Sequence, residues 1–169
     1  AAPFQAGQLP DIQAKYFHLG PLLDADIDTQ LIIELAAKSQ VSLDVQGCLR
    51  YVEHQKVLHH NWPDKHLALP HVKILKANDI EMKAITGESD IYKGCTLLAA
   101  LGVKEVIITL GDKGSVIFAD GIYYSIPAYK PTTVTDATGC GDTYMAGYLY
   151  KKSQGASILE AGKFGAAMA

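Results

Sequence analysis

The sequence contains few of the residues and runs that mark secreted, membrane or nucleic-acid-binding proteins. Its three cysteines, Cys48, Cys95 and Cys140, show no paired spacing, which predicts a reducing compartment and hence the cytoplasm. No apolar run approaches a membrane span, and the N-terminal AAPFQAGQLP lacks the basic and apolar parts of a signal peptide. There is no run of lysine and arginine, and the net charge is −3, so we expect no nucleic-acid partner.

Several familiar catalytic motifs are also absent. The sequence has no GxxxxGK[ST], no GxGxxG and no HRD or DFG set, which excludes P-loop proteins and protein kinases. Five of the six histidines lie between residues 54 and 71, but no HExxH or CxxC spacing accompanies them. This stretch is therefore interpreted as a polar loop region and not as a metal site.

The composition, with 49% hydrophobic and 20% charged residues among 169, suits one globular domain over residues 1–169 with a sizeable core. Strand and helix patterns alternate, which predicts an α/β fold with a mostly parallel sheet and helices on both faces. Strands are expected at 15–19, 41–45, 72–75 and 105–110, in a hairpin at 115–119 and 122–126, and at 132–135. Helices are expected at 29–39, 78–85, 90–101 and 139–152, with a last one capped by Ser157 and Glu160. Residues 46–70 show no clear pattern.

The stretch TDATGCGDTYMAGYLY, from Thr135 to Tyr150, places glycines and a carboxylate at the first turn of a helix. Helix N-termini carry unpaired N–H groups and partial positive charge, so Gly139, Cys140 and Gly141 can present bare N–H groups to an anion. Asp142, beside such an anion, can accept the proton of an attacking hydroxyl. An ordinary helix start, with glycines serving tight packing, is the alternative.

This stretch resembles the second signature of the ribokinase family of carbohydrate kinases, of the phosphofructokinase-B type, whose pattern is D-T-x-G-A-G-D. The matching residues are Asp136, Thr138, Gly139, Gly141 and Asp142. Two further motifs follow the family in order and spacing: N-x-x-E, at Asn78 and Glu81, and T-x-G-x-x-G, at 109–114. Ala137 and Cys140 stand where the family usually has Thr and Ala.

The resemblance implies a ribokinase-like three-layer α/β/α sandwich and an ATP-dependent transfer of the γ-phosphoryl group to a sugar hydroxyl. It makes Asp142 the base and Gly139, Cys140 and Gly141 the anion hole. Asn78 and Glu81 would support Mg²⁺ and the phosphates, Glu81 through water.

The same resemblance places Thr109, Gly111 and Gly114 at the nucleotide site, and Asp136 with the Thr138 carbonyl at a monovalent-cation site, for which K⁺ is a candidate. Each of these residues also has a plainer interpretation. Asn78 can be a helix cap, Glu81 a solvated helix residue, Thr109 the end of a strand, and the two glycines parts of a turn.

The family's first signature, Gly-Gly-x-x-x-N, and its small β lid do not occur in the sequence. We therefore expect a partial chain that carries the nucleotide-binding and catalytic half, with a homodimer formed through the missing lid. The acceptor stays open among sugars, keto-sugar acids, inositol and nucleosides. The alternatives are a nucleoside or inositol kinase, a non-catalytic member that senses nucleotide or sugar, and a metal-dependent hydrolase.

Overall fold

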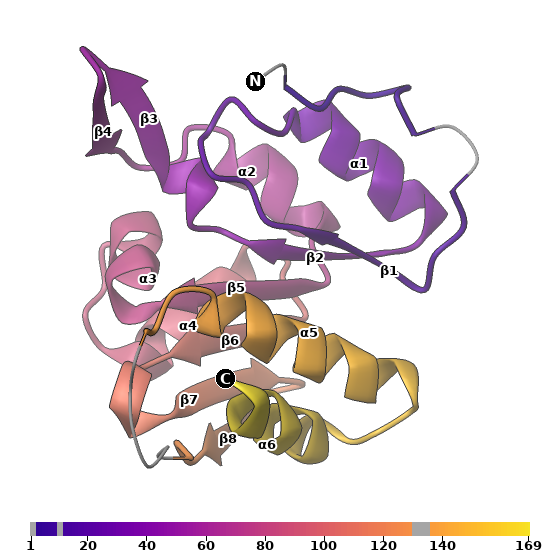
Figure 1. Cartoon of the computed structure of the whole chain (residues 1–169), viewed down its shortest axis with the longest axis vertical. Helices are drawn as coiled ribbons and strands as arrows, with labels where there is room; N and C mark the ends of the chain where they lie inside the picture. Colours follow the sequence, from indigo (N-terminus) through magenta and orange to yellow (C-terminus); the bar gives the residue numbers. More distant parts are fainter. Residues whose placement is uncertain (1–2, 10–11, 130–135) are drawn as a thin grey trace.

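The computed structural model describes residues 3–9, 12–129 and 136–169, which form a layered α/β unit (Figure 1). The strands are β1 (Tyr16–Leu19), β2 (Gln40–Asp44), β3 (Arg50–Glu53), β4 (Lys56–His59), β5 (Ile74–Asn78), β6 (Glu105–Thr109), β7 (Ser115–Ala119) and β8 (Ile122–Ile126). The α-helices are α1 (Thr29–Lys38), α2 (Lys65–Ala68), α3 (Asp79–Thr86), α4 (Ile91–Ala100), α5 (Cys140–Ser153) and α6 (Ile158–Met168). Short 3₁₀ turns are η1 (Gly47–Leu49), η2 (Leu69–His71) and η3 (Gly111–Lys113).

Six strands form the central sheet in the order β1-β2-β5-β6-β7-β8. The first four run parallel, and β7 and β8 add an antiparallel hairpin at one edge. The turn of that hairpin is the predicted Asp120-Gly121, and both residues have positive φ, of 50° and 78°. The prediction of a mostly parallel sheet is confirmed.

Side chains alternate between the two faces of the sheet and build two cores. Leu75, Val106 and Ile108 pack with α1, α3 and α4 on one face. Ile74 and Ile107 pack with α5 and α6 on the other face. The helices therefore cover both faces, as Figure 1 shows, and the three-layer prediction is confirmed.

Helix ends follow their predicted caps. Asp28 Oδ1 accepts a hydrogen bond from the Gln30 N–H (2.9 Å) and starts α1, and Asp90 does the same for α4 through the Lys93 N–H (3.0 Å). The strand expected at 72–75 instead begins at Ile74, because the Val72 N–H closes the preceding 3₁₀ turn on the Leu69 carbonyl.

Residues 46–70 contain a feature that the sequence did not reveal. Strands β3 and β4 form a separate two-stranded hairpin, which projects from the body of the molecule (Figure 1). Both turn residues, His54 and Gln55, have positive φ. The strand expected at 132–135 lies outside the described residues.

The three thiols are free, and Cys48 and Cys95 are buried. Burial raises the pKa of each of these two thiols to about 12, so neither is a reactive thiolate at neutral pH. None of the helices in the described residues is long and apolar enough to span a membrane.

Candidate active site

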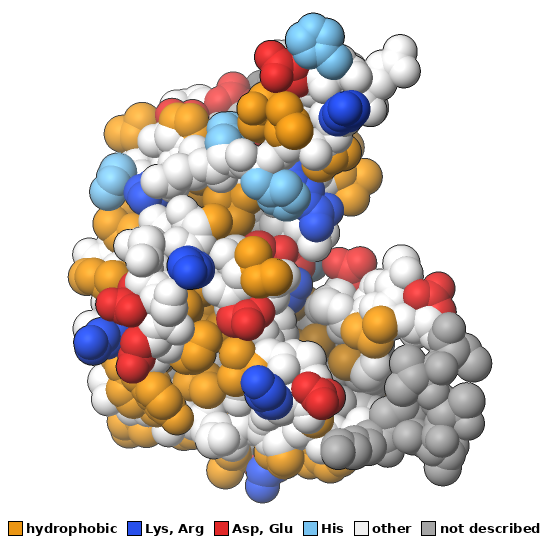
Figure 2. Space-filling view, turned by 90° about the vertical axis from the view of Figure 1, so that its left-hand side faces the viewer, with side chains coloured by type: hydrophobic (Ala, Val, Ile, Leu, Met, Phe, Trp, Pro, Cys, Tyr) orange, Lys and Arg blue, Asp and Glu red, His pale blue; other side chains and the backbone are white. Residues whose placement is uncertain are grey.

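The carboxyl ends of the four parallel strands meet at one edge of the sheet, where open α/β sheets bind their ligands. Asp44, Asn78 and Thr109 lie at the ends of β2, β5 and β6. Figure 2 views the molecule from this side and shows a hollow with acidic and basic side chains in it. The residues predicted from the sequence to carry chemistry are grouped at or near this edge.

The first turn of α5 leaves backbone donors free. Gly139 is the N-cap with φ +80°, and no side chain caps the helix there. The Cys140 N–H is bonded to the Ala137 carbonyl (3.3 Å). Among residues 3–9, 12–129 and 136–169, the N–H groups of Gly141 and Asp142 have no acceptor. Of the predicted anion-hole positions, Gly141 can thus donate to an anion directly, and the Asp142 N–H adds a donor that was not predicted, whereas the Cys140 donor is already engaged.

The side chains around this turn leave it open toward solvent. A Cβ added at Gly139 would meet no atom within 4 Å, so a ligand can approach the backbone there. Asp142 is exposed on the first turn. The Cys140 thiol instead donates to the Ala169 carbonyl (Sγ to O, 3.2 Å), which links the start of α5 to the end of α6.

Asp136 and Thr138, the predicted monovalent-cation residues, form a local turn just before α5. The Asp136 Oδ1 accepts from the Thr138 N–H at 2.8 Å. Hydrogen bonds from the Thr138 backbone and hydroxyl lower the pKa of Asp136, so this exposed carboxylate is ionised at neutral pH. A cation role for these two residues stays a prediction.

The T-x-G-x-x-G loop connects β6 to β7. The Thr109 hydroxyl is 3.4 Å from the Ala77 carbonyl, and Gly111 begins η3 with φ +60° and open space around its missing Cβ. Gly114 differs, because a Cβ there would lie 2.1 Å from the Ile126 carbonyl oxygen. Gly111 is therefore open to a ligand, whereas Gly114 is required by the fold of the loop.

Asn78 and Glu81 form a capping box at the start of α3. The Asn78 Oδ1 accepts from the Glu81 N–H, and the Glu81 Oε2 accepts from the Asn78 N–H, each at 2.8 Å. Glu81 is buried, so the interpretation as a solvated helix residue does not hold. In the part of the chain that is described, its Oε1 has no hydrogen-bond partner and is the atom suited to a water on Mg²⁺.

Replacing Glu81 by glutamine separates these two roles. The amide keeps the capping box but loses the charge, so we expect little change in melting temperature and about a tenfold rise in the Mg²⁺ concentration needed for half-maximal activity. Titrations of the rate with Mg²⁺ measure this. Glu160 in the matching capping box of α6 supplies the control, Glu160→Gln. Equal Mg²⁺ dependence in both variants would contradict a magnesium role.

Sequence reasoning missed a charged group beside α5. Lys76 in β5 and Asp44 in β2 pair at 2.7 Å, and both are buried. His18 in β1 lies close enough to feel both charges, and its Nδ1 is 3.1 Å from the Ser42 Oγ. The available signal was a lysine between apolar residues in the strand ILKAN.

His18 connects this pair with the first turn of α5. Partial burial of its ring lowers the His18 pKa, while the nearby Asp44 and Asp142 carboxylates act in the opposite direction. The imidazole is therefore mainly neutral at pH 7. The charges of Asp44, Lys76 and Asp142 thus lie close enough to His18 to act on its pKa.

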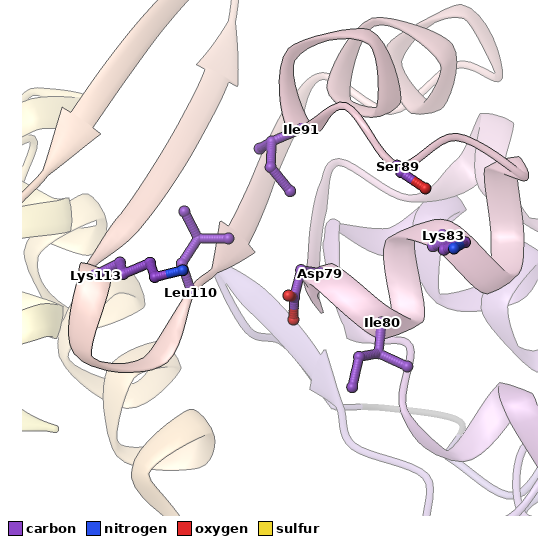
Figure 3. A pocket seen from close by; sticks show the side chains of 7 residues that line it. All are labelled: Asp79, Ile80, Lys83, Ser89, Ile91, Leu110 and Lys113. Atoms are coloured by element: carbon purple, nitrogen blue, oxygen red, sulfur yellow. The ribbon is translucent and has the colours of Figure 1, made fainter.

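A pocket near the loop of Gly111 lies on the opposite face of the sheet. Figure 3 shows that its lining comes from Asp79, Ile80 and Lys83 of α3, from Leu110 and Lys113 after β6, and from Ser89 and Ile91 near the start of α4. Leu110 packs against the core shared with α1, α3 and α4, whereas α5 lies on the other face. The pocket contains none of the predicted site residues, so it is not where we place the chemistry. Nor do the described ranges contain a group of three or more His, Cys, Asp or Glu arranged to hold a metal ion.

Known proteins resemble this chain over most of its length. The model of the pfkB family carbohydrate kinases matches residues 13–169. The chain belongs to that family. The family resemblance predicted from the three motifs is therefore confirmed.

Individual relatives differ in the molecules that their names mention. Cytidine kinase of Thermococcus kodakarensis is 29% identical over 158 residues, which cover 91% of this chain and 53% of that protein. Ribokinase of Arabidopsis thaliana is 36% identical over 110 residues, covering 60% of this chain and 28% of the relative. The chain thus spans about half the length of the cytidine kinase.

Solved structures share the fold. A pyrophosphate-dependent kinase in the ribokinase family, complexed with a pyrophosphate analog and myo-inositol, superposes with a TM-score of 0.87 at 30% identity, over 98% of this chain and 60% of that chain. Ribokinase of Arabidopsis thaliana, complexed with ribose and ATP, gives a TM-score of 0.74 at 27% identity, over 91% and 48%. The ribokinase-like fold predicted from the motifs is confirmed.

Proposed function

We propose that the protein is a kinase that transfers the γ-phosphoryl group of ATP to a hydroxyl of a sugar or sugar-like small molecule. One observation supports this most strongly: the N–H groups of Gly141 and Asp142, which have no acceptor among the described residues, adjoin an exposed carboxylate on the same turn. Donors for an anion and an acceptor for a proton are the two groups that such a transfer needs in close proximity.

In the proposed step, the acceptor oxygen forms a bond to the γ-phosphorus while the bond from that phosphorus to the bridging oxygen of ADP breaks. The proton of the hydroxyl passes to Asp142, and ADP leaves with the electron pair of the broken bond. The N–H groups of Gly141 and Asp142 bind the transferring phosphoryl oxygens. Mg²⁺, when bound, would neutralise phosphate charge, with Glu81 and Asn78 supporting it from the end of β5.

A second donor deserves a direct test. Pyrophosphate-dependent kinases superpose on this chain with TM-scores of 0.87 and 0.88, above the 0.74 of the ATP complex of ribokinase. The phosphate-binding turn of α5 needs no nucleotide base to hold a phosphoryl group. Pyrophosphate is therefore the alternative donor, and inositol and nucleosides join sugars as candidate acceptors.

The full-length protein should be assayed with ATP or pyrophosphate against ribose, fructose, 2-keto-3-deoxygluconate, myo-inositol and cytidine. Phosphorylated acceptor, detected by mass spectrometry, would support the kinase and identify donor and acceptor. Release of phosphate to water alone would favour a hydrolase instead. Donor binding without any transfer across the panel would favour the non-catalytic sensing alternative.

The remaining predictions concern the whole protein. A location in the cytoplasm, a homodimer through the family's β lid and a role for K⁺ at Asp136 and Thr138 are all consistent with the family but stay predictions. Potassium dependence of the rate, measured against sodium at constant ionic strength, would test the last of these.

A further inference from the structure

A buried ion pair lies under the first turn of α5. The Lys76 Nζ is 2.7 Å from the Asp44 Oδ2, and the two side chains are only 8% and 9% exposed. Asp44 and Lys76 are register partners on the parallel strands β2 and β5. The second oxygen, Asp44 Oδ1, accepts the Gln46 N–H at 3.1 Å. Asp44 is therefore held on both oxygens and fixes the position of the ammonium group.

The ammonium group lies against the backbone of the anion hole. A Cβ added at Gly141 would stand 2.8 Å from the Lys76 Nζ and 3.4 Å from its Cε. At Gly139, two residues earlier, the same addition meets nothing. Gly141 therefore leaves room for the charged end of Lys76, and the positive charge is adjacent to the Gly141 N–H, which has no acceptor in the described part of the chain.

Stability alone gives a poor reason for this pair. Burying two charges costs desolvation energy that their attraction repays only in part, and apolar residues of similar size often hold strands together as well. Neighbouring positions on the same face, Ile74 and Ile107, are apolar. The lysine ammonium has three N–H donors, and Asp44 is its one hydrogen-bond partner among the described residues.

Phosphoryl transfer gathers negative charge on the oxygens of the moving group. The donors of the α5 turn are neutral amides, and Asp142 beside them is an acid. A positive charge that is fixed in place and itself buried, as Lys76 is, stabilises that developing charge more than a mobile charge in water does.

We propose that Lys76 is a positioning residue for this transfer. Its ammonium group, held by Asp44 behind Gly141, provides the positive charge that stabilises the phosphoryl group on the anion hole. This inference rests on the proposed function.

The test compares two variants of the full-length protein. Asp44→Asn keeps the ammonium group, whereas Asp44→Asn/Lys76→Met removes both charges and leaves no unpaired buried ion. We expect the double variant to lose about 10²- to 10³-fold in kcat with little change in the donor KM. The single variant should lose less kcat than the double variant, because its ammonium group remains although the carboxylate that fixes it is gone. Circular dichroism and thermal unfolding establish that each variant is folded.

Gly141→Ala tests the role of Lys76 in a second, independent way. Its new Cβ would displace the ammonium group, so we expect kcat to fall when Lys76 is present. The same change should add little to the loss in the Asp44→Asn/Lys76→Met background, because the atom that it meets is gone. A purely structural role would not produce this split between kcat and KM or this dependence on background.

Failure of the Lys76 role and failure of the proposed kinase activity would give different results. A folded double variant with the kcat of the unaltered protein would overturn the role of Lys76. If both charge variants unfold, Gly141→Ala decides, and a folded Gly141→Ala protein with unchanged kcat would overturn it. Absence of transfer by the unaltered protein would refute the proposed function itself, and this role with it.

Discussion

Asp142→Asn is expected to lower kcat by about 10²- to 10⁴-fold, because the amide cannot accept the proton of the acceptor hydroxyl. Donor binding should change little, since the Gly141 and Asp142 N–H groups that bind the phosphoryl oxygens belong to the backbone. Initial rates and isothermal titration with the donor measure the two quantities separately.

The same chemical change at Asp120 is the matched control. Asp120 lies in the β7–β8 turn with φ +50°, a conformation that asparagine also adopts, so Asp120→Asn should leave both stability and rate near their original values. A loss of less than about tenfold in Asp142→Asn would contradict the assignment of Asp142 as the base.

Gly114→Ala is expected to lower the free energy of unfolding by about 3 kcal/mol or more. Two effects add: a backbone conformation at φ +90° that side chains rarely adopt, and a Cβ placed 2.1 Å from the Ile126 carbonyl oxygen. Because Ile126 ends β8, the substitution would push the β6–β7 loop away from the hairpin edge.

Gly111→Ala provides the comparison within the same loop. Gly111 also has positive φ, but a Cβ there meets no neighbour, so Gly111→Ala should lower the free energy of unfolding by about 1 kcal/mol. Urea unfolding of the two variants gives both values. If both variants lower the free energy of unfolding equally, the contact with Ile126 is not the reason that position 114 requires glycine.

Local patterns explain why much of the fold could be predicted. The β-branched run of β6, the Asp120-Gly121 turn and the Asp28 cap each depend on a few neighbouring residues. The β3–β4 hairpin could not be predicted in this way. Its strands have only four residues each and are largely exposed, so neither length nor apolar alternation marks them.

Part of the site could likewise be predicted from the sequence, and part could not. The α5 turn is contiguous in sequence, so its glycines and Asp142 are visible as one motif. Lys76 and Asp44 are 32 residues apart, and only the register of β2 against β5 brings them together. Likewise, only the position of Ile126 shows that a side chain would clash at Gly114 and not at Gly111. The spacing of T-x-G-x-x-G does not contain this information.

We place the transferring phosphoryl group at the first turn of α5. A crystal structure of the full-length protein with ADP, acceptor and a metal fluoride that mimics the transferring group would test this placement most directly. We expect the fluoride within hydrogen-bond distance of the Gly141 and Asp142 N–H groups, with the acceptor hydroxyl on the Asp142 carboxylate. A mimic bound away from this turn, or an acceptor hydroxyl out of reach of Asp142, would contradict it.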